Sequence, residues 1–221
     1  MEVRLIAATQ CLDQTGPEEL LERAGRLCYA SAMGDTAKFL RARVREGHLS
    51  LIEHATASFY IGGISRTCSH QLVRHRLCSF SQRSQRYVSE GGAEFIVPLS
   101  IAQNEEASRV YQNFLASSRE AYTTLRELGV PKEDSRFVLP NATETELIMS
   151  LNFREALHLF RVRISRGAQW EIREVCARML DQLSPIAPSL FGELLDELKG
   201  AHPEWFRFLP QQDEVDQASE K

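Results

Sequence analysis

EHATASFYI, residues 53–61, alternates small or apolar side chains with polar ones at a period of two, which predicts a β-strand with one solvated face. His54 and Thr56 would share that face. We expect Gly62-Gly63 to end the strand, and residues 65–76 have a composition that suits a helix. A strand followed directly by a helix therefore opens the central part of the chain.

Working outward, the remaining elements do not follow a regular alternation of strand and helix. The pattern predicts strands at residues 2–8, 87–88, 94–97 and 142–151, an extended ligand-covering loop at 77–85, and helices that begin near residues 17, 36, 100, 152, 167 and 189. This order is typical of the α+β class, here a single domain with an antiparallel or mixed sheet flanked by helices. We expect residues 1–210 to form that domain and the acidic residues 211–221 to be a flexible tail.

The composition limits the kind of partner. The chain of 221 residues has a formal net charge of -4, which disfavours a general affinity for nucleic acids or anionic membranes. Its first residues carry Glu2 and Arg4 and no apolar core, so we expect no secretory signal and a cytoplasmic location. The five cysteines have no CxxC spacing and the histidines no metal-ligand spacing, so we predict no disulfide framework and no metal site.

Residues 74–87, RHRLCSFSQRSQRY, concentrate four guanidinium groups and an imidazole in fourteen residues. No aspartate or glutamate occurs between Glu53 and Glu90, so nearby acids in the sequence do not cancel this charge. Clusters of arginine recognise phosphate or carboxylate by bidentate hydrogen bonds, which indicates an anionic ligand. The alternative is a basic surface loop whose arginines pair with acids from elsewhere in the fold.

The spacing within this stretch matches a long and specific pattern. Arg74-His75-Arg76, followed after seven residues by Ser84 and Arg86-Tyr87, resembles the signature of the flavin-dependent thymidylate synthases. Matching motifs extend over residues 54–172. The resemblance implies an enzyme that methylates dUMP to dTMP with FAD as cofactor and with NADPH and methylenetetrahydrofolate as co-substrates. It also implies a homotetramer with active sites at the subunit interfaces.

The resemblance assigns roles to individual residues of this chain. Arg163 would be catalytic, because a fixed cation at the N3–O4 edge of uracil stabilises the ring as negative charge develops. The residues implied for dUMP are Gln71, Leu72, Val73, Arg74, Gln82, Arg83, Ser84, Gln85, Arg86, Arg136 and Arg163. The residues implied for FAD are Thr56, Arg74, His75, Arg76, Gln82, Asn152, Arg154 and His158, with His54 and Tyr87 as possible further site residues.

Several of these residues have alternative interpretations. Arg163 could satisfy free carbonyl groups at the end of a helix. Cys78 could be a nucleophile, although the family that the chain resembles uses none, and Ser84 could be one only with a base in reach. Ser81, Arg83, His158 and Gly167 depart from common family residues at their positions, which leaves contacts with folate open.

Two other classes of function compete with an enzyme. A single-stranded nucleic-acid binder could use Phe80 and Tyr87 as stacking platforms within the basic stretch. A catalytically silent nucleotide-binding or assembly protein is the other. Two aromatic side chains are few for stacking on bases, and the net negative charge of the chain opposes nucleic-acid binding. The enzyme is therefore the leading hypothesis.

Overall fold

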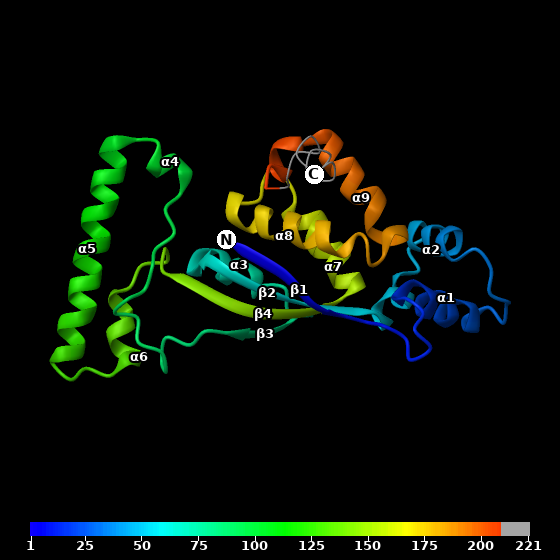
Figure 1. Ribbon diagram of the computed structural model, residues 1–221, viewed down its shortest axis with the longest axis horizontal. Helices are drawn as coiled ribbons and strands as arrows, with labels where there is room; N and C mark the ends of the chain where they lie inside the picture. Colours follow the sequence, from blue (N-terminus) through cyan, green and yellow to red (C-terminus); the bar gives the residue numbers. More distant parts are fainter. Residues whose placement is uncertain (209–221) are drawn as a thin grey trace, which may run out of the picture. The chain divides into compact units, whose positions relative to one another are not determined.

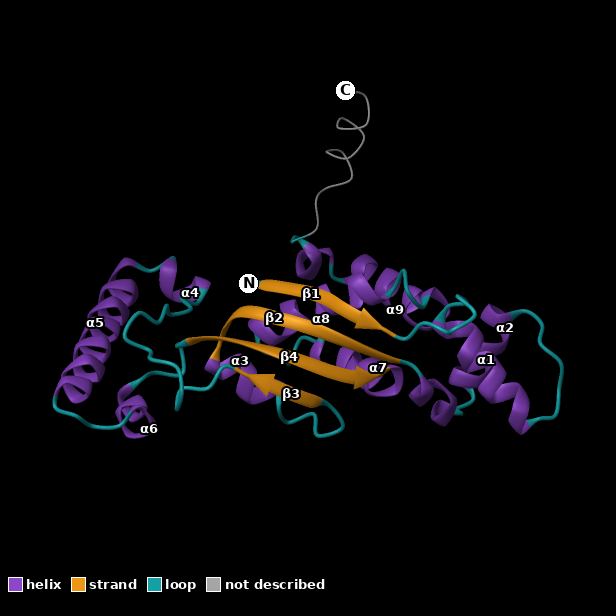
Figure 2. Cartoon of the chain, turned by 60° about the horizontal axis from the view of Figure 1, so that its bottom comes forward, coloured by secondary structure: helices purple, strands orange, loops and turns teal. Residues whose placement is uncertain are grey.

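The computed structural model describes residues 1–208 and confirms the α+β class. Four strands form one antiparallel sheet in the order β1-β2-β4-β3, as Figure 2 shows. The strands are β1 (Glu2–Ala8), β2 (Thr56–Ser65), β3 (Ser79–Gln82) and β4 (Glu144–Asn152). The α-helices are α1 (Pro17–Cys28), α2 (Thr36–Arg45), α3 (Arg66–Leu72), α4 (Leu99–Ala102), α5 (Glu105–Glu127), α6 (Lys132–Ser135), α7 (Phe153–Arg163), α8 (Trp170–Leu183) and α9 (Pro188–Ala201), and Figure 1 labels them. Short 3-10 turns are η1 (Leu49–His54), η2 (Arg136–Val138) and η3 (Pro203–Phe206).

The chain divides into two compact units. The α5 unit contains Met1–Glu2, Ile61–Arg74 and Phe80–Ile148, and the α7 unit contains Val3–Tyr60, His75–Ser79 and, among the described residues, 149–208. The tail predicted at 211–221 lies outside the described residues. Within residues 1–208, no helix combines the length and the apolar content that crossing a bilayer requires.

Aromatic side chains form the centre of the α7 unit. The ring of Phe191 on α9 meets Phe153 and Phe160 of α7 edge to face, with centroids 5.3 and 5.8 Å apart. All three rings are fully buried, and α7 also packs on α8 and η1. Buried aromatic pairs of this geometry stabilise a fold beyond their buried area alone, so α7 is held firmly from one side.

The glycine pair does not end the strand, contrary to the prediction. Strand β2 continues through Gly62-Gly63 to Ser65. Gly63 has a φ of 64°, and a Cβ there would lie 3.1 Å from the backbone of Met1. The glycine therefore allows a close backbone approach and not a chain reversal. Ser65 then caps α3, which ends at Leu72, so the predicted helix at 65–76 is too long.

Four further predictions, all between residues 77 and 128, are wrong. The predicted loop at 77–85 contains edge strand β3, and just beyond it Arg83 N–H donates to the Glu146 carbonyl of β4 over 3.0 Å. The predicted strand at 87–88 is a turn, and the one at 94–97 is reduced to a single bridge between Phe95 and Thr143. The long helix predicted from residue 100 is divided into α4 and α5, because Asn104 caps α5 with its side chain.

Candidate active site

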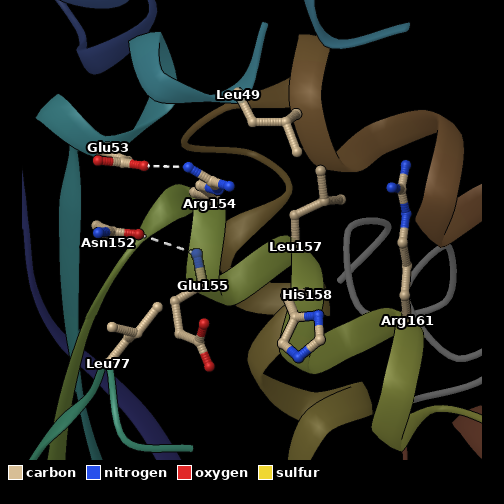
Figure 3. A pocket seen from close by; sticks show the side chains of 9 residues that line it. All are labelled: Leu49, Glu53, Leu77, Asn152, Arg154, Glu155, Leu157, His158 and Arg161. Carbon is tan, nitrogen blue, oxygen red and sulfur yellow. Dashed lines mark hydrogen bonds and ion pairs between the residues drawn. The ribbon is translucent and has the colours of Figure 1, made fainter. Parts of the chain in front are cut away.

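A pocket of about 530 Å³ opens beside the first turns of α7 in the α7 unit. Its walls combine cationic, amide and carboxylate groups with leucine side chains, as Figure 3 shows. The lining residues are Leu49, Glu53, Leu77, Asn152, Arg154, Glu155, Leu157, His158 and Arg161. The volume lies within the roughly 300–1,000 Å³ range of small-molecule sites, and the mixed lining suits a ligand with both aromatic and anionic parts.

The start of α7 fixes the polar side of this pocket. Asn152 caps the helix, with its Oδ1 accepting a hydrogen bond from the N–H of Glu155 over 2.9 Å. Arg154, His158 and Arg161 follow at offsets of four and three, so they lie on one stripe of the helix. All three side chains line the pocket. Arg154 is also paired with Glu53 from η1.

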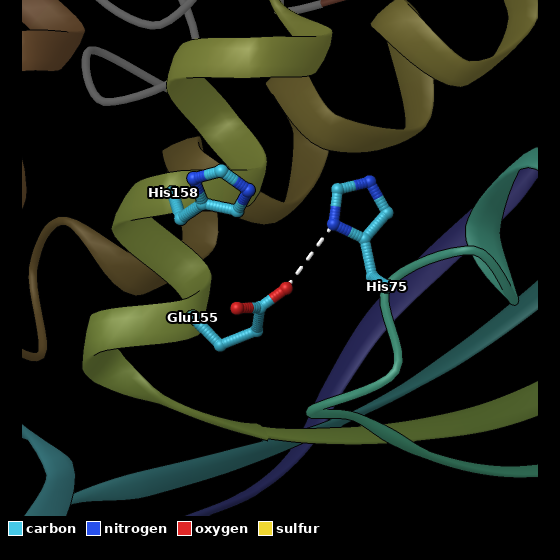
Figure 4. A group of neighbouring side chains, drawn as sticks. All are labelled: His75, Glu155 and His158. Atoms are coloured by element: carbon cyan, nitrogen blue, oxygen red, sulfur yellow. Dashed lines mark hydrogen bonds and ion pairs between the residues drawn. The ribbon is translucent and has the colours of Figure 1, made fainter.

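Next to the pocket, the imidazole of His75 lies between the carboxylate of Glu155 and the guanidinium group of Arg163. Its Nδ1 lies 3.1 Å from Oε1 of Glu155, a pair drawn in Figure 4, and its Nε2 accepts a hydrogen bond from Nε of Arg163 over 3.0 Å. Because an arginine Nε can only donate, Nε2 of His75 is the acceptor and Nδ1 carries the proton toward Glu155. Burial lowers the pKa of His75, the bond to Glu155 opposes that shift, and the charge of Arg163 lowers the pKa further. The imidazole is therefore neutral at physiological pH.

The same region brings together three groups that could ligate a metal. Ligand atoms of His75, Glu155 and His158 all lie within 4.8 Å of one another, which the sequence spacing did not indicate. Both nitrogens of His75 already have partners, however. An ion on either nitrogen would have to displace Glu155 or stand beside the positive Arg163. The arrangement is therefore suited to a hydrogen-bonded chain more than to a cation.

Comparison with known proteins identifies the family. The chain is 44% identical over 189 residues to the flavin-dependent thymidylate synthase of Geobacter sulfurreducens, which covers 80% of this chain and 82% of that protein. It is 38% identical over 223 aligned positions to the flavin-dependent thymidylate synthase of Mycobacterium marinum, which covers 87% and 89% of the two chains. The family model described as "Thymidylate synthase complementing protein" matches residues 10–189. The chain belongs to the flavin-dependent thymidylate synthase family. The resemblance noted in the sequence is thereby confirmed.

Several residues that the flavin-dependent thymidylate synthase pattern assigns to FAD gather in the α7 unit. Asn152, Arg154 and His158 line the pocket, and His75 is buried beside Glu155. Others do not line it. Thr56 is exposed at the start of β2, where its Oγ1 lies 3.2 Å from that of Thr9. His54 and Arg76 are also exposed, and His54 belongs to η1 and not to the strand that it was expected to share with Thr56.

The residues assigned to dUMP lie in the α5 unit, apart from Arg163. Gln82 donates its amide to Ser69 and Thr145, over 2.9 and 3.3 Å. Arg86 and Arg136 meet at Glu133: Arg86 pairs with its carboxylate over 3.0 Å and Arg136 Nε donates to its carbonyl over 3.0 Å.

The other members of this set differ in how accessible they are. The side chain of Leu72 is fully buried, so a contact with substrate would have to use its backbone. Arg83 is exposed, with Nε 4.0 Å from the carboxylate of Glu90. The exposed members are Val73, Arg74 and Tyr87, and the partly buried ones are Gln71, Ser84 and Gln85.

The alternative interpretations can be compared with these contacts. Burial, together with the charge of Glu155, raises the pKa of Cys78 to about 12, so its thiol is not ionised near neutral pH and is a poor nucleophile. The Oγ of Ser84 accepts from the N–H of Arg86, and no base of the described residues is bonded to it. The ion pairs Arg86–Glu133 and Arg154–Glu53 are about half exposed, and pairs of this kind are weak enough to exchange for a ligand.

Sequence reasoning missed several lining residues, of which Glu155 is the most important. It stands three residues after the capping Asn152, a spacing that predicts a local helix-capping role. Its carboxylate instead reaches His75, eighty residues earlier in the chain. The other missed residues are Leu49, Glu53, Leu77 and Leu157. The two glutamates could have been suspected as acids near a cationic stripe, whereas the leucines carry no sequence signal of a site.

Proposed function

We propose that this chain converts dUMP, methylenetetrahydrofolate, NADPH and a proton to dTMP, tetrahydrofolate and NADP⁺, with FAD as bound cofactor. The methylene group of the folate becomes the C5 methyl group of thymine, and the reducing electrons come from NADPH. The observation that carries the proposal is the pocket beside α7, where Asn152, Arg154 and His158 lie together in a chain that belongs to this family.

The pocket suits part of a flavin dinucleotide. Arg154 and Arg161 can neutralise anionic groups, Asn152 and His158 can hydrogen-bond, and Leu77 adds an apolar wall. We infer that these residues hold FAD together with Thr56, Arg74, His75, Arg76 and Gln82. When bound, FAD supplies hydride transfer and carries the one-carbon unit. The protein contributes orientation and charge.

Arg163 is the residue to which we assign activation of the pyrimidine. Its guanidinium is partly buried at the end of α7 and keeps its charge at any physiological pH. A cation facing the N3–O4 edge of uracil would stabilise the ring as electron density moves toward C5, without a covalent adduct. The pKa of Cys78, raised to about 12, supports this route over attack by a thiolate.

The nucleotide itself would be held by residues of the α5 unit. We infer that arginines and amides bind its phosphate, since multidentate arginine sites suit that group. The proposed residues are Gln71, Leu72, Val73, Arg74, Gln82, Arg83, Ser84, Gln85, Arg86 and Arg136, with His54 and Tyr87 as further candidates.

The decisive experiment compares two arginines that are close in sequence. Arg163→Ala should lower dTMP formation by roughly 100-fold or more, the usual cost of removing a group that stabilises developing charge. Arg166→Ala, which removes an exposed arginine three residues later, should retain activity within about threefold, because surface substitutions away from a site have small effects. Equal dTMP formation by the Arg163→Ala variant and the unmodified protein would contradict the assignment.

We also propose that the protein acts in the cytoplasm as a homotetramer with active sites at subunit interfaces, and that residues 1–210 form its enzymatic domain. In support, α5 exposes the apolar side chains of Val110 and Phe114. Light scattering after size-exclusion chromatography tests the assembly. The unmodified protein should have the mass of four chains, and the double variant Val110→Glu, Phe114→Glu should have a smaller mass. A monomeric unmodified protein would contradict the proposal.

A further inference from the structure

The contacts of Glu155 are not those of a helix-capping residue. It occupies the third position of α7, and a glutamate there commonly bonds back to the N–H of the capping residue. Its Oε1 instead lies 3.1 Å from Nδ1 of His75. Both side chains are nearly inaccessible, with 5% of Glu155 and 7% of His75 exposed. A carboxylate buried in this way needs a strong hydrogen-bond partner, and His75 supplies it.

The bond from Glu155 determines which nitrogen of His75 faces Arg163. With its proton on Nδ1 and directed to Glu155, the imidazole presents the lone pair of Nε2 to Nε of Arg163 over 3.0 Å. The opposite tautomer would set two N–H groups against each other. His75 is also fixed on its backbone side, since its carbonyl accepts from the N–H of Cys78 over 3.1 Å.

We infer that Glu155 is a positioning residue for Arg163, acting through His75. The contact to His75 uses Nε of Arg163, so it sets the plane of the guanidinium group. In proteins generally, a carboxylate bonded to one nitrogen of a histidine commonly fixes the tautomer, and the other nitrogen then binds a metal or takes part in catalysis. This inference rests on the role proposed for Arg163 in dUMP activation.

The charges around His75 support a neutral imidazole. The groups that face it are Glu155, Arg163 and His158, whose ring centroid lies 5.9 Å away, with Cys78 nearby in the chain. Protonating His75 would abolish the acceptor for Arg163 and place two cations together. Burial and Arg163 both lower the pKa of His75, in line with this arrangement.

Activity measurements on the FAD-loaded enzyme test the inference first. Glu155→Leu should lower kcat for dTMP formation by about 10- to 100-fold, the cost of a small misorientation of a catalytic group. The KM for dUMP should change by less than about threefold, because a group that acts only on the orientation of Arg163 makes no contact of its own with that substrate. Glu155→Gln, whose amide oxygen can still accept from Nδ1–H, should have a kcat between those of Glu155→Leu and the unmodified enzyme. Glu174→Gln on α8, whose carboxylate pairs with Arg178, is the control and should match the unmodified enzyme.

A double-variant cycle separates positioning from general damage. In a His75→Gln background, where the imidazole is gone, adding Glu155→Leu should change kcat by less than about twofold, because residues of one network are not additive. If Arg163→Ala is inactive while Glu155→Leu and Glu155→Gln keep full kcat, the inference is wrong and the role of Arg163 stands. Full activity of Arg163→Ala would instead refute the proposed function.

A second readout needs no turnover. Nitrogen-15 spectra of the protein labelled at histidine should show His75 protonated at Nδ1 and unprotonated at Nε2 between pH 6 and 8. Glu155→Leu should give a mixture of tautomers. A proton on Nε2 of His75 in the unmodified protein would overturn the inference whatever the kinetics show.

Discussion

In the α5 unit, the carboxylate of Glu90 lies 4.0 Å from Nε of Arg83, which is too far for a hydrogen bond. Only 2% of Glu90 is exposed, and neither carboxylate oxygen has a hydrogen-bond partner among residues 1–208. Burial raises the pKa of Glu90, and the charges of Arg83 and Arg66 only partly oppose the shift. A buried carboxylate therefore lies beside Arg83, which the family pattern links to nucleotide binding, without a hydrogen bond to it.

We predict that Glu90→Gln stabilises the protein at neutral pH. The folded state binds the Glu90 proton more tightly than the unfolded chain does, so stability falls as pH rises above the unfolded pKa of about 4.3. Glutamine cannot ionise and avoids this loss, which should be worth about 1–3 kcal/mol in the free energy of unfolding at pH 8. Urea unfolding at pH 5 and pH 8 measures the difference.

The advantage of Glu90→Gln should be smaller at pH 5 than at pH 8. Glu120→Gln on the exposed side of α5 serves as the control and should show no such trend. A stability difference that does not vary with pH would mean that Glu90 keeps its ordinary pKa in the folded protein.

The second prediction concerns Gln182 on α8. Its Oε1 accepts from the N–H of Leu5 over 2.6 Å and its Nε2 donates to the carbonyl of Val3 over 2.8 Å. In the part of the chain that the structure describes, β1 has a strand neighbour on one side only, so this amide pairs with it as a second strand would. Gln182→Met should leave both backbone groups unpaired and lower the free energy of unfolding by about 1–3 kcal/mol.

Denaturant unfolding and hydrogen exchange at Leu5 measure this effect. Gln182→Glu, which keeps an acceptor for Leu5 but loses the donor to Val3, should be intermediate. Unchanged stability and exchange in Gln182→Met would show that water replaces the side chain at no cost.

The third prediction is that the thiol of Cys78 is dispensable. Its pKa of about 12 leaves almost no thiolate at pH 8. Cys78→Ala should therefore form dTMP at a rate within about threefold of the unmodified enzyme, since no covalent step depends on it. Iodoacetamide at pH 8 should label exposed Cys28 well before Cys78. Inactivation of the enzyme that parallels labelling of Cys78 would contradict this prediction.

The predictions from sequence succeeded where the signal was local. The helix predicted to begin near residue 152 is present as α7, which Asn152 caps. The family itself followed from a spacing within fourteen residues. Such features depend on neighbours in the chain, which a single sequence displays directly.

Features that depend on distant partners were not predictable in this way. Residues 79–82 read SFSQ, a polar segment with no strong preference for a strand, and they pair with β4, more than sixty residues later. Likewise, Gly63 allows the close approach of the Met1 backbone, about sixty residues earlier in the chain, and Glu155 bonds to His75 across eighty residues. In each case a tertiary contact outweighs the local preference.

The last prediction concerns the ion pair between Glu53 and Arg154 in the pocket. Their side chains are 42% and 49% exposed, so the pair contributes little to stability. An anionic flavin dinucleotide would compete with Glu53 for the guanidinium and would be repelled by the carboxylate. Glu53→Gln should therefore tighten FAD binding to the apoprotein by about two- to tenfold, equivalent to the roughly 1 kcal/mol limit of an exposed pair. Fluorescence titration with FAD measures the affinity.

Salt and a matched variant distinguish this electrostatic effect from a change in shape. Raising the ionic strength to about 0.5 M should remove most of the gain, because exposed charges are screened within a few ångströms there. Glu46→Gln, which breaks the exposed pair with Arg43, should leave FAD affinity unchanged. Weaker binding by Glu53→Gln would mean that Glu53 orients Arg154 for the flavin, and Arg154→Ala should then weaken binding at least as much as Glu53→Gln.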